Sequence, residues 1–143
     1  DKPIRWILED ARTFVTREIK RGRTYDGIIM DPPAFGHGPE NELWKIEENL
    51  LFLIEDCFKL LGAGHGLSED EKNQTKKPLF FLINGYASGY SAIAYENILR
   101  ELVEKYGGTI EAGELAIQEK PASSSQPLVP RLLPCGIFTR WSR

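Results

Sequence analysis

Two acidic groups, each placed directly after an apolar run, are the first candidates for chemistry. Residues 9–11 (Glu-Asp-Ala) follow the run at residues 4–8, and residues 31–36 (Asp-Pro-Pro-Ala-Phe-Gly) follow the run at residues 26–30. The second group combines a carboxylate with two prolines, which fix a stiff turn of the backbone, and with Phe35, which can stack on a planar ring. It is therefore suited to orienting a base or another aromatic substrate. A loop punctuated by prolines that only connects two elements fits the same spacing.

The elements that position these groups follow from hydrophobic periodicity. Apolar residues recur at helical spacing in three segments, residues 11–22, 43–61 and 95–106. Continuous apolar runs predict three strands, over residues 4–8, 26–30 and 79–83. The last third predicts two strands that pair antiparallel, residues 109–119 and 133–141, joined by a Pro- and Ser-rich segment over residues 120–130.

This order of elements predicts the fold class and the edge where a ligand binds. A strand followed by a helix occurs three times before the final strand pair, which implies an α/β fold with a mostly parallel sheet and one reversed terminal strand. The length of 143 residues argues for one domain. In open sheets of this class, ligands bind beyond the carboxyl ends of the strands. The residues to consider are therefore those just past three strands: Asp10 with its neighbours, Asp31 with its neighbours, and Asn84-Gly85-Tyr86.

The group Asp31-Pro32-Pro33-Ala34-Phe35-Gly36 resembles motif IV of class I S-adenosylmethionine-dependent methyltransferases. It is most similar to the Asp-Pro-Pro-x-Phe version found in large-subunit ribosomal RNA methyltransferases. Residues 9–11, one strand and one helix earlier, are similar to the acidic motif that holds the adenine of the cofactor. The terminal strand pair is similar to the reversed last strand of that family. The resemblance implies a Rossmann-like methyltransferase fold that uses S-adenosylmethionine.

The resemblance covers residues 1–143 but only the carboxyl-terminal half of the family's domain, so the chain is interpreted as a partial methyltransferase domain. It lacks the Gly-rich first loop and the acidic residue after the second strand, which in the family cradle the methionine part and the ribose of the cofactor. A Gly-x-Gly-x-Gly pattern at residues 62–66 does not replace that loop, because residues 47–61 before it have helical periodicity and the loop must follow a strand.

The family's sheet also makes a prediction about neighbouring strands. It places two other strands between the ones that correspond to residues 4–8 and 26–30. We therefore expect no ladder between these two runs. Direct pairing, which would close the gap left by the missing strands, is the alternative.

The resemblance implies a role for each matched residue. Asp31 would orient the nucleophile and contact the cofactor, while Pro32 and Pro33 would shape the pocket and Phe35 would stack on the substrate. Methyl transfer to RNA is the implied activity.

For the cofactor, the resemblance implies that Asp10 accepts a hydrogen bond from the amine of adenine while the amide of Ala11 approaches the ring nitrogen. An Asp directly before a helix is also a favoured N-cap, and the two roles can coexist.

Two other functions stay open. A non-catalytic substrate-binding module of the same fold would keep the motif without the Gly-rich loop. A methyltransferase acting on exocyclic amino groups of nucleic acids needs an aromatic residue where this sequence has Ala34. Residues 84–90 contain no cysteine, which argues against the covalent mechanism of cytosine-C5 enzymes. Cys57 and Cys135 are instead expected to act as small hydrophobic residues.

Charge and composition limit which binding partners the sequence predicts. With 18 Lys and Arg against 21 Asp and Glu, the net charge is -3, so contact with RNA requires a local patch such as residues 17–23. Helix ends collect such charges without a ligand as well. His37 and His65 have no partner at ligand spacing, so no metal site is predicted.

The same composition also predicts the cellular compartment of the protein. No apolar run approaches the roughly 20 residues of a membrane helix, so no membrane contact is expected. Two cysteines are too few for a disulfide framework. These features predict a protein of the reducing cytoplasm, and they leave the oligomeric state open.

Overall fold

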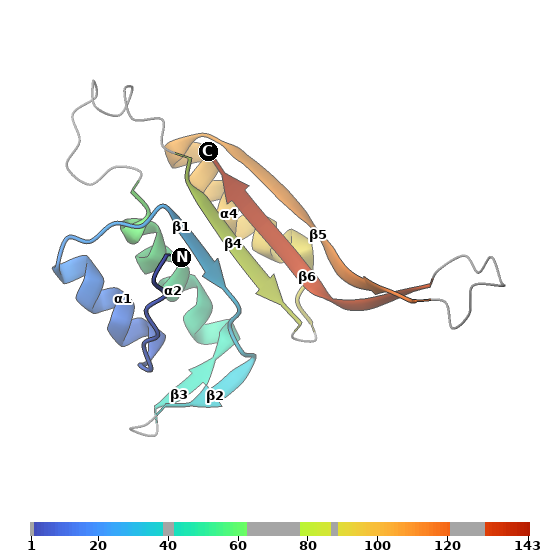
Figure 1. Ribbon diagram of the computed structural model, residues 1–143, viewed down its shortest axis with the longest axis horizontal. Helices are drawn as coiled ribbons and strands as arrows, with labels where there is room; N and C mark the ends of the chain where they lie inside the picture. Colours follow the sequence, from blue (N-terminus) through green and yellow to red (C-terminus); the bar gives the residue numbers. More distant parts are fainter. Residues whose placement is uncertain (1, 39–41, 63–77, 87–88, 121–130) are drawn as a thin grey trace. The chain divides into compact units, whose positions relative to one another are not determined.

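The computed structural model describes residues 2–38, 42–62, 78–86, 89–120 and 131–143. They divide into two compact units. The first unit comprises Asp1–Asp26 and Ala34–Lys77, and the second comprises Gly27–Pro33 and Pro78–Arg143. The chain therefore crosses between the units after Asp26, Pro33 and Lys77. Figure 1 shows the helices and strands in chain order.

The second unit is built on a four-stranded sheet. Its strands are β1 (Gly27–Met30), β4 (Phe80–Gly85), β5 (Thr109–Gln118) and β6 (Leu132–Ser142), in the order β1-β4-β6-β5. β1 pairs parallel with β4, and β6 pairs antiparallel with both β4 and β5. Three strands therefore point the same way and β6 is reversed, as Figure 1 shows. The predicted mostly parallel sheet with one reversed terminal strand is confirmed.

Helix α4 (Ala92–Tyr106) packs on strands β5 and β6 of this sheet. It begins after Ser91, whose side chain accepts a hydrogen bond from the amide of Ala94, and it ends at Gly107, which has a positive φ of 71°. Its buried residues are Tyr95, Leu99 and Leu102. The predicted helix over residues 95–106 is confirmed, and the N-cap places its start three residues earlier.

The first unit contains two helices and a short hairpin. Helix α1 (Ala11–Lys20) packs on helix α2 (Ile46–Leu60), and β2 (Phe35–His37) pairs antiparallel with β3 (Leu43–Lys45). The predicted helix over residues 11–22 is confirmed. The helix predicted over residues 43–61 is correct except at its start, because the first three residues pair with β2 in an extended conformation. This hairpin replaces the loop expected after the Asp-Pro-Pro group.

The strand predicted over residues 4–8 is wrong. None of these residues is in a strand, and Ile4 and Trp6 are 74% and 88% exposed. A strand requires a neighbour to accept and donate its backbone hydrogen bonds, and the described part of the chain offers these residues none. The expectation that they form no ladder with residues 26–30 is confirmed, because among the described residues β1 pairs with β4 and residues 4–8 pair with no strand, and the alternative of direct pairing is wrong.

Two further segments named in the sequence analysis are not among the residues that the structure describes. Residues 63–77, with most of the Gly-x-Gly-x-Gly pattern and His65, are not among the described residues, and neither are residues 121–130 of the expected Pro- and Ser-rich connection. Within the parts that are described, no helix is long and apolar enough to cross a membrane.

Candidate functional site

The group after β1 lies at the same sheet edge as the group after β4. Met30 pairs with Ile83 in the parallel ladder, so Asp31 and Asn84 are the next residues along two neighbouring strands. Asp31 and Pro33 are exposed, whereas Pro32 between them is buried. The arrangement places an exposed carboxylate on a rigid, partly buried turn at the carboxyl ends of two parallel strands, where ligands bind in open α/β sheets.

Tyr95 lies directly against the end of β4. Its side chain is fully buried, and a Cβ added to Gly85 would lie only 2.3 Å from the Tyr95 hydroxyl oxygen. The ring of Tyr95 stacks on Tyr90 with centroids 5.7 Å apart. Burial raises the pKa of Tyr95, and the nearby Tyr90 and Asp31 raise it further. In the sequence, Tyr95 is one residue of an apolar helix face, and no pattern signals its place beside this edge.

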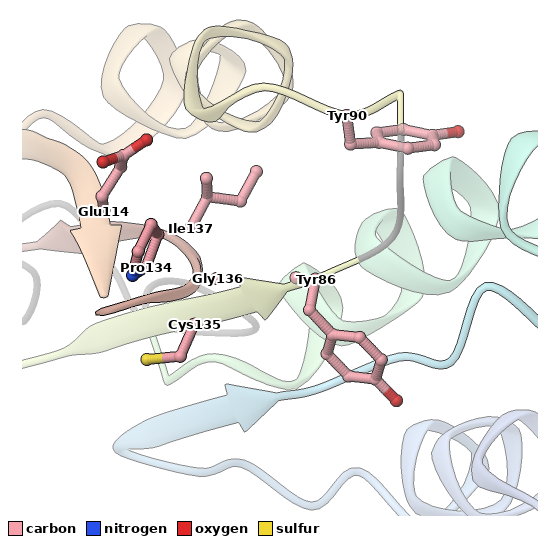
Figure 2. Close-up of a pocket in the computed structure, with 8 residues that line it drawn as sticks. Tyr86, Tyr90, Glu114, Pro134, Cys135, Gly136 and Ile137 are labelled. Atoms are coloured by element: carbon pink, nitrogen blue, oxygen red, sulfur yellow. The ribbon is translucent and has the colours of Figure 1, made fainter. Parts of the chain in front are cut away.

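A pocket of about 390 Å³ opens next to the same edge (Figure 2). Its lining comes from the end of β4, the segment before α4 and the two last strands: Gly85, Tyr86, Tyr90, Glu114, Pro134, Cys135, Gly136 and Ile137. Figure 2 shows that the rings of Tyr86 and Tyr90 lie apart, on segments that leave β4 and enter α4. The contribution of β5 and β6 to this pocket could not be predicted, because the strand pattern of these segments does not show which of their residues pass the end of β4.

Strand β6 contains a β-bulge among the residues that line the pocket. Leu115 pairs with Gly136 and Ala116 with Pro134, so Cys135 is an extra residue of β6 in the ladder. Gly136 has a φ of 151°, and a Cβ there would lie 3.0 Å from the carbonyl oxygen of Gly85. A glycine is thus required for β6 to approach the end of β4 so closely.

The two cysteines differ. Cys57 is buried on α2 as expected, and burial, with a smaller contribution from Asp56, raises the pKa of its thiol to about 12. Cys135 is exposed, so the prediction that it acts as a small hydrophobic residue is wrong. Cys135 lies in the first part of β6, where Leu132 and Leu133 are also exposed, at 66% and 64%.

The first unit holds the predicted adenine-binding pair. Asp10 is the N-cap of α1: its Oδ1 accepts a hydrogen bond of 2.9 Å from the amide of Thr13, and Arg12 Nε lies 3.8 Å from the same oxygen. The N-cap interpretation is therefore confirmed. Ala11 is the first residue of the helix, where backbone amides have no acceptor within the helix. A second carboxylate oxygen and a helix-start amide suit the amine and ring nitrogen of an adenine edge.

Phe35 also belongs to the first unit. It is 58% exposed on β2 and packs edge-on against His37, with ring centroids 5.2 Å apart. One face of the ring is thus available for stacking. The structure groups Asp31, Pro32 and Pro33 in one unit and Asp10, Ala11 and Phe35 in the other.

Two of the basic residues proposed for phosphate contact, Arg17 and Arg21, pair with carboxylates. Arg17 pairs with Glu9 and with Glu18, and Arg21 lies 3.1 Å from Glu18. The hydroxyl of Tyr25 donates a 2.7 Å hydrogen bond to Glu18. That hydrogen bond and the adjacent arginines lower the pKa of Glu18. Of the described residues, no three His, Cys, Asp or Glu side chains are grouped to hold a metal ion.

The order β1-β4-β6-β5, with β6 reversed between two strands of the opposite direction, defines a Rossmann-like α/β fold of the methyltransferase type. A solved S-adenosylmethionine-dependent methyltransferase from Agrobacterium tumefaciens is similar to 97% of this chain, with 34% identity and a TM-score of 0.76. The chain spans 40% of that protein's length.

Two other solved structures are less similar to this chain. A proposed S-adenosylmethionine-dependent methyltransferase from Streptococcus mutans shares 15% identity, with a TM-score of 0.49, over 94% of this chain and 30% of its own length. A proposed methyltransferase solved with S-adenosylhomocysteine, SMU.776, shares 17% identity over the same fractions, with a TM-score of 0.48. A scan against models of protein families and a search of curated proteins found no match.

Proposed function

We propose that this chain is the carboxyl-terminal part of the catalytic domain of an S-adenosylmethionine-dependent methyltransferase that acts on RNA in the cytoplasm. The observation that supports this most strongly is the 34% identity and TM-score of 0.76 to a solved methyltransferase over nearly the whole chain. The position of Asp31 at the carboxyl end of β1, beside the end of β4, is consistent with that activity.

In this proposal, S-adenosylmethionine supplies an electrophilic methyl group on a sulfonium, and the chain positions the acceptor. Asp31 accepts a hydrogen bond from the attacking group and so aligns it for in-line displacement. Pro32 is buried and, with Pro33, keeps the carboxylate on a stiff turn. The protein's main contribution is thus orientation and the exclusion of water from the reacting pair.

Asp10 and Ala11 would hold the adenine of the cofactor, and Phe35 would contact the substrate. The observed cap uses Asp10 Oδ1, so the other oxygen accepts from the exocyclic amine while the Ala11 amide donates to the ring. Phe35, with its exposed ring, stacks on a base.

RNA as the substrate rests on the Asp-Pro-Pro-x-Phe pattern of Asp31 to Phe35, which resembles the ribosomal RNA enzymes. The pocket of about 390 Å³ beside Gly85 has room for a single base. Such a base would be taken from a single-stranded or flipped-out position, because enzymes that modify bases must reach them outside the helical stack.

A non-catalytic binding module of the same fold is the second candidate. It is favoured by the absence, among the described residues, of a Gly-rich loop between a strand and a helix. A methyltransferase specific for exocyclic amino groups is a less suitable candidate, because Ala34 stands where an aromatic residue stacks in those enzymes.

The test is methyl transfer by the full-length protein. Tritiated S-adenosylmethionine is incubated with the protein and with total RNA from a strain that lacks it, and the label is followed through ribonuclease and protease digestion. We expect label that ribonuclease releases. Label released only by protease would contradict the RNA substrate. No transfer, together with no cofactor binding by calorimetry, would contradict the enzyme and favour the binding module.

A further inference from the structure

The hydroxyl of Tyr95 is buried without a hydrogen-bond partner among the described residues. An unpaired buried hydroxyl destabilises a fold, and each such group in a native protein calls for an explanation. A phenylalanine would fill the same space without that cost. The hydroxyl is therefore not explained by packing.

The position of this hydroxyl connects it to the proposed site. It lies so close to Gly85 that a Cβ there would be 2.3 Å away, so the absence of a side chain at Gly85 provides the space it occupies. Gly85 ends β4, one residue beyond Asn84, and Asn84 is level with Asp31 on the neighbouring strand. The nearby Asp31 carboxylate is one cause of the raised pKa of Tyr95, after burial and Tyr90.

Asp31 is a suitable acceptor for this hydroxyl at the shared edge of β1 and β4. Gly85 has no side chain, and Tyr90 presents its ring to the ring of Tyr95. Thr139 on β6 donates from Oγ1 to the carbonyl oxygen of Ala92 at 3.3 Å, and among the described residues no hydrogen bond joins it to the Tyr95 hydroxyl. Asp31 offers carboxylate oxygens at the same edge, and hydrogen bonds to carboxylates are among the stronger ones.

We propose that Tyr95 is a positioning residue for Asp31: with the methyl acceptor bound, its hydroxyl donates a hydrogen bond to the Asp31 carboxylate, directly or across one water. The bond fixes one carboxylate oxygen, so that the other faces the attacking group of the substrate. A bridging water costs little and serves nearly as well as a direct contact. This inference rests on the proposed function, since it assigns Tyr95 to that same site.

The test compares Tyr95→Phe with wild type in the full-length protein, using the tritium assay on RNA from the deficient strain. We expect kcat to fall about 10- to 100-fold, the factor that one hydrogen bond to a charged group is worth. KM for S-adenosylmethionine should change less than twofold and the melting temperature should stay the same or rise. Tyr106→Phe, at the other end of α4, is the matched control and should keep wild-type kcat.

A double-mutant cycle separates this inference from the proposed function. If Tyr95 acts through Asp31, adding Tyr95→Phe to Asp31→Asn lowers kcat no further. A wild-type kcat in Tyr95→Phe, or a loss that multiplies with that of Asp31→Asn, would overturn the inference and leave the role of Asp31 intact. A lower melting temperature in Tyr95→Phe would also overturn it, because the hydroxyl would then have a structural partner. Wild-type kcat in Asp31→Asn would remove the proposed role of Asp31 itself, and this inference with it.

Discussion

Residues 27–30 and residues 4–8 differ in one structural property, the presence of a neighbouring strand. Both runs are apolar and both lead into an acidic group. The first run pairs with β4 over four residues and becomes β1, whereas the second has no ladder and leaves Ile4 and Trp6 exposed. An apolar run thus becomes a strand only where a partner completes its backbone hydrogen bonds. The group after β1 is therefore on a rigid support, and the group before α1 depends on the helix alone.

The largest expected effect is on the stability of the strand-supported region. Phe81 is fully buried in β4, and Phe81→Ala should lower the free energy of unfolding by about 3–5 kcal/mol, the usual cost of removing a buried aromatic side chain. Leu8→Ala is the matched control, because Leu8 is fully exposed, and should change the free energy by less than about 0.5 kcal/mol. Urea denaturation of the 143-residue chain measures both. An equal loss in the two variants would contradict the contrast between the regions.

A second prediction concerns the contact at the end of β4. Gly85→Ala forces a methyl group against the Tyr95 hydroxyl, which should cost about 1–3 kcal/mol of stability, as overpacking does. Gly36→Ala in the hairpin of the first unit is the control, since no atom lies within 4 Å of the added Cβ. Combining Gly85→Ala with Tyr95→Phe should recover part of the loss. Equal stability of the two alanine variants by denaturation would show that the edge is loosely packed.

A third prediction tests how the acidic group before α1 is held. Asp10→Ala removes the acceptor of the Thr13 amide and should lower stability by about 1 kcal/mol, the ordinary value of an N-cap. Asp10→Asn keeps an oxygen at the same place and should stay close to wild type. Urea denaturation of both variants measures their free energies of unfolding. A loss of the same size in both would mean that the charge of Asp10, and not its capping oxygen, stabilises the helix.

A fourth prediction uses the cysteines of the two units. At pH 8 the raised pKa of Cys57, about 12, leaves its thiol protonated and unreactive, whereas Cys135 is exposed. A thiol reagent such as Ellman's should therefore label one cysteine in the native chain and two in urea. Cys135→Ala should abolish native labelling. Rapid labelling of Cys57 in that variant would show that α2 opens readily.

The pKa of Cys57 also has a consequence for stability at high pH. Because the folded thiol keeps its proton to a higher pH than the unfolded thiol, the contribution of this group to stability is complete below the unfolded pKa. It is lost as the pH rises from there toward about 12. Cys57→Ala should have a shallower decline of stability in that alkaline range, measured by denaturation at several pH values. A decline equal to that of wild type would show that groups other than Cys57 cause the loss of stability at alkaline pH.

Prediction from the sequence succeeded where a local pattern and a tertiary partner agree. Residues 95–106 have helical periodicity with a capping Ser91 before them, and the helix forms. Residues 4–8 have an equally clear pattern without a partner, and the strand does not form. Residues 43–45 match the helical period, but pairing with β2 overrides it. Local periodicity cannot report which other segment is available for pairing.

The candidate site was predictable in part for a similar reason. Asp31 and Asn84 each follow an apolar run, so their shared edge could be inferred from strand direction alone. Tyr95 could not be assigned to that edge, because its helical spacing is that of any core residue. Cys135 and Gly136 reach the pocket through a bulge in β6, and a one-residue irregularity of pairing leaves no periodic signal.

The role of Asp31 is the central claim, and the turnover of Asp31→Asn tests it most directly. Asparagine keeps the shape and removes the charge, so kcat of the full-length protein on RNA from the deficient strain should fall by about 100-fold or more, the scale for loss of one preorganised polar group. Affinity for S-adenosylmethionine should change much less, and Asp56→Asn, which removes an exposed carboxylate paired with Lys59 on α2, should keep wild-type kcat. Unchanged turnover and melting temperature in Asp31→Asn would contradict the claim, because Asp31 would then only end a strand, where asparagine serves equally well.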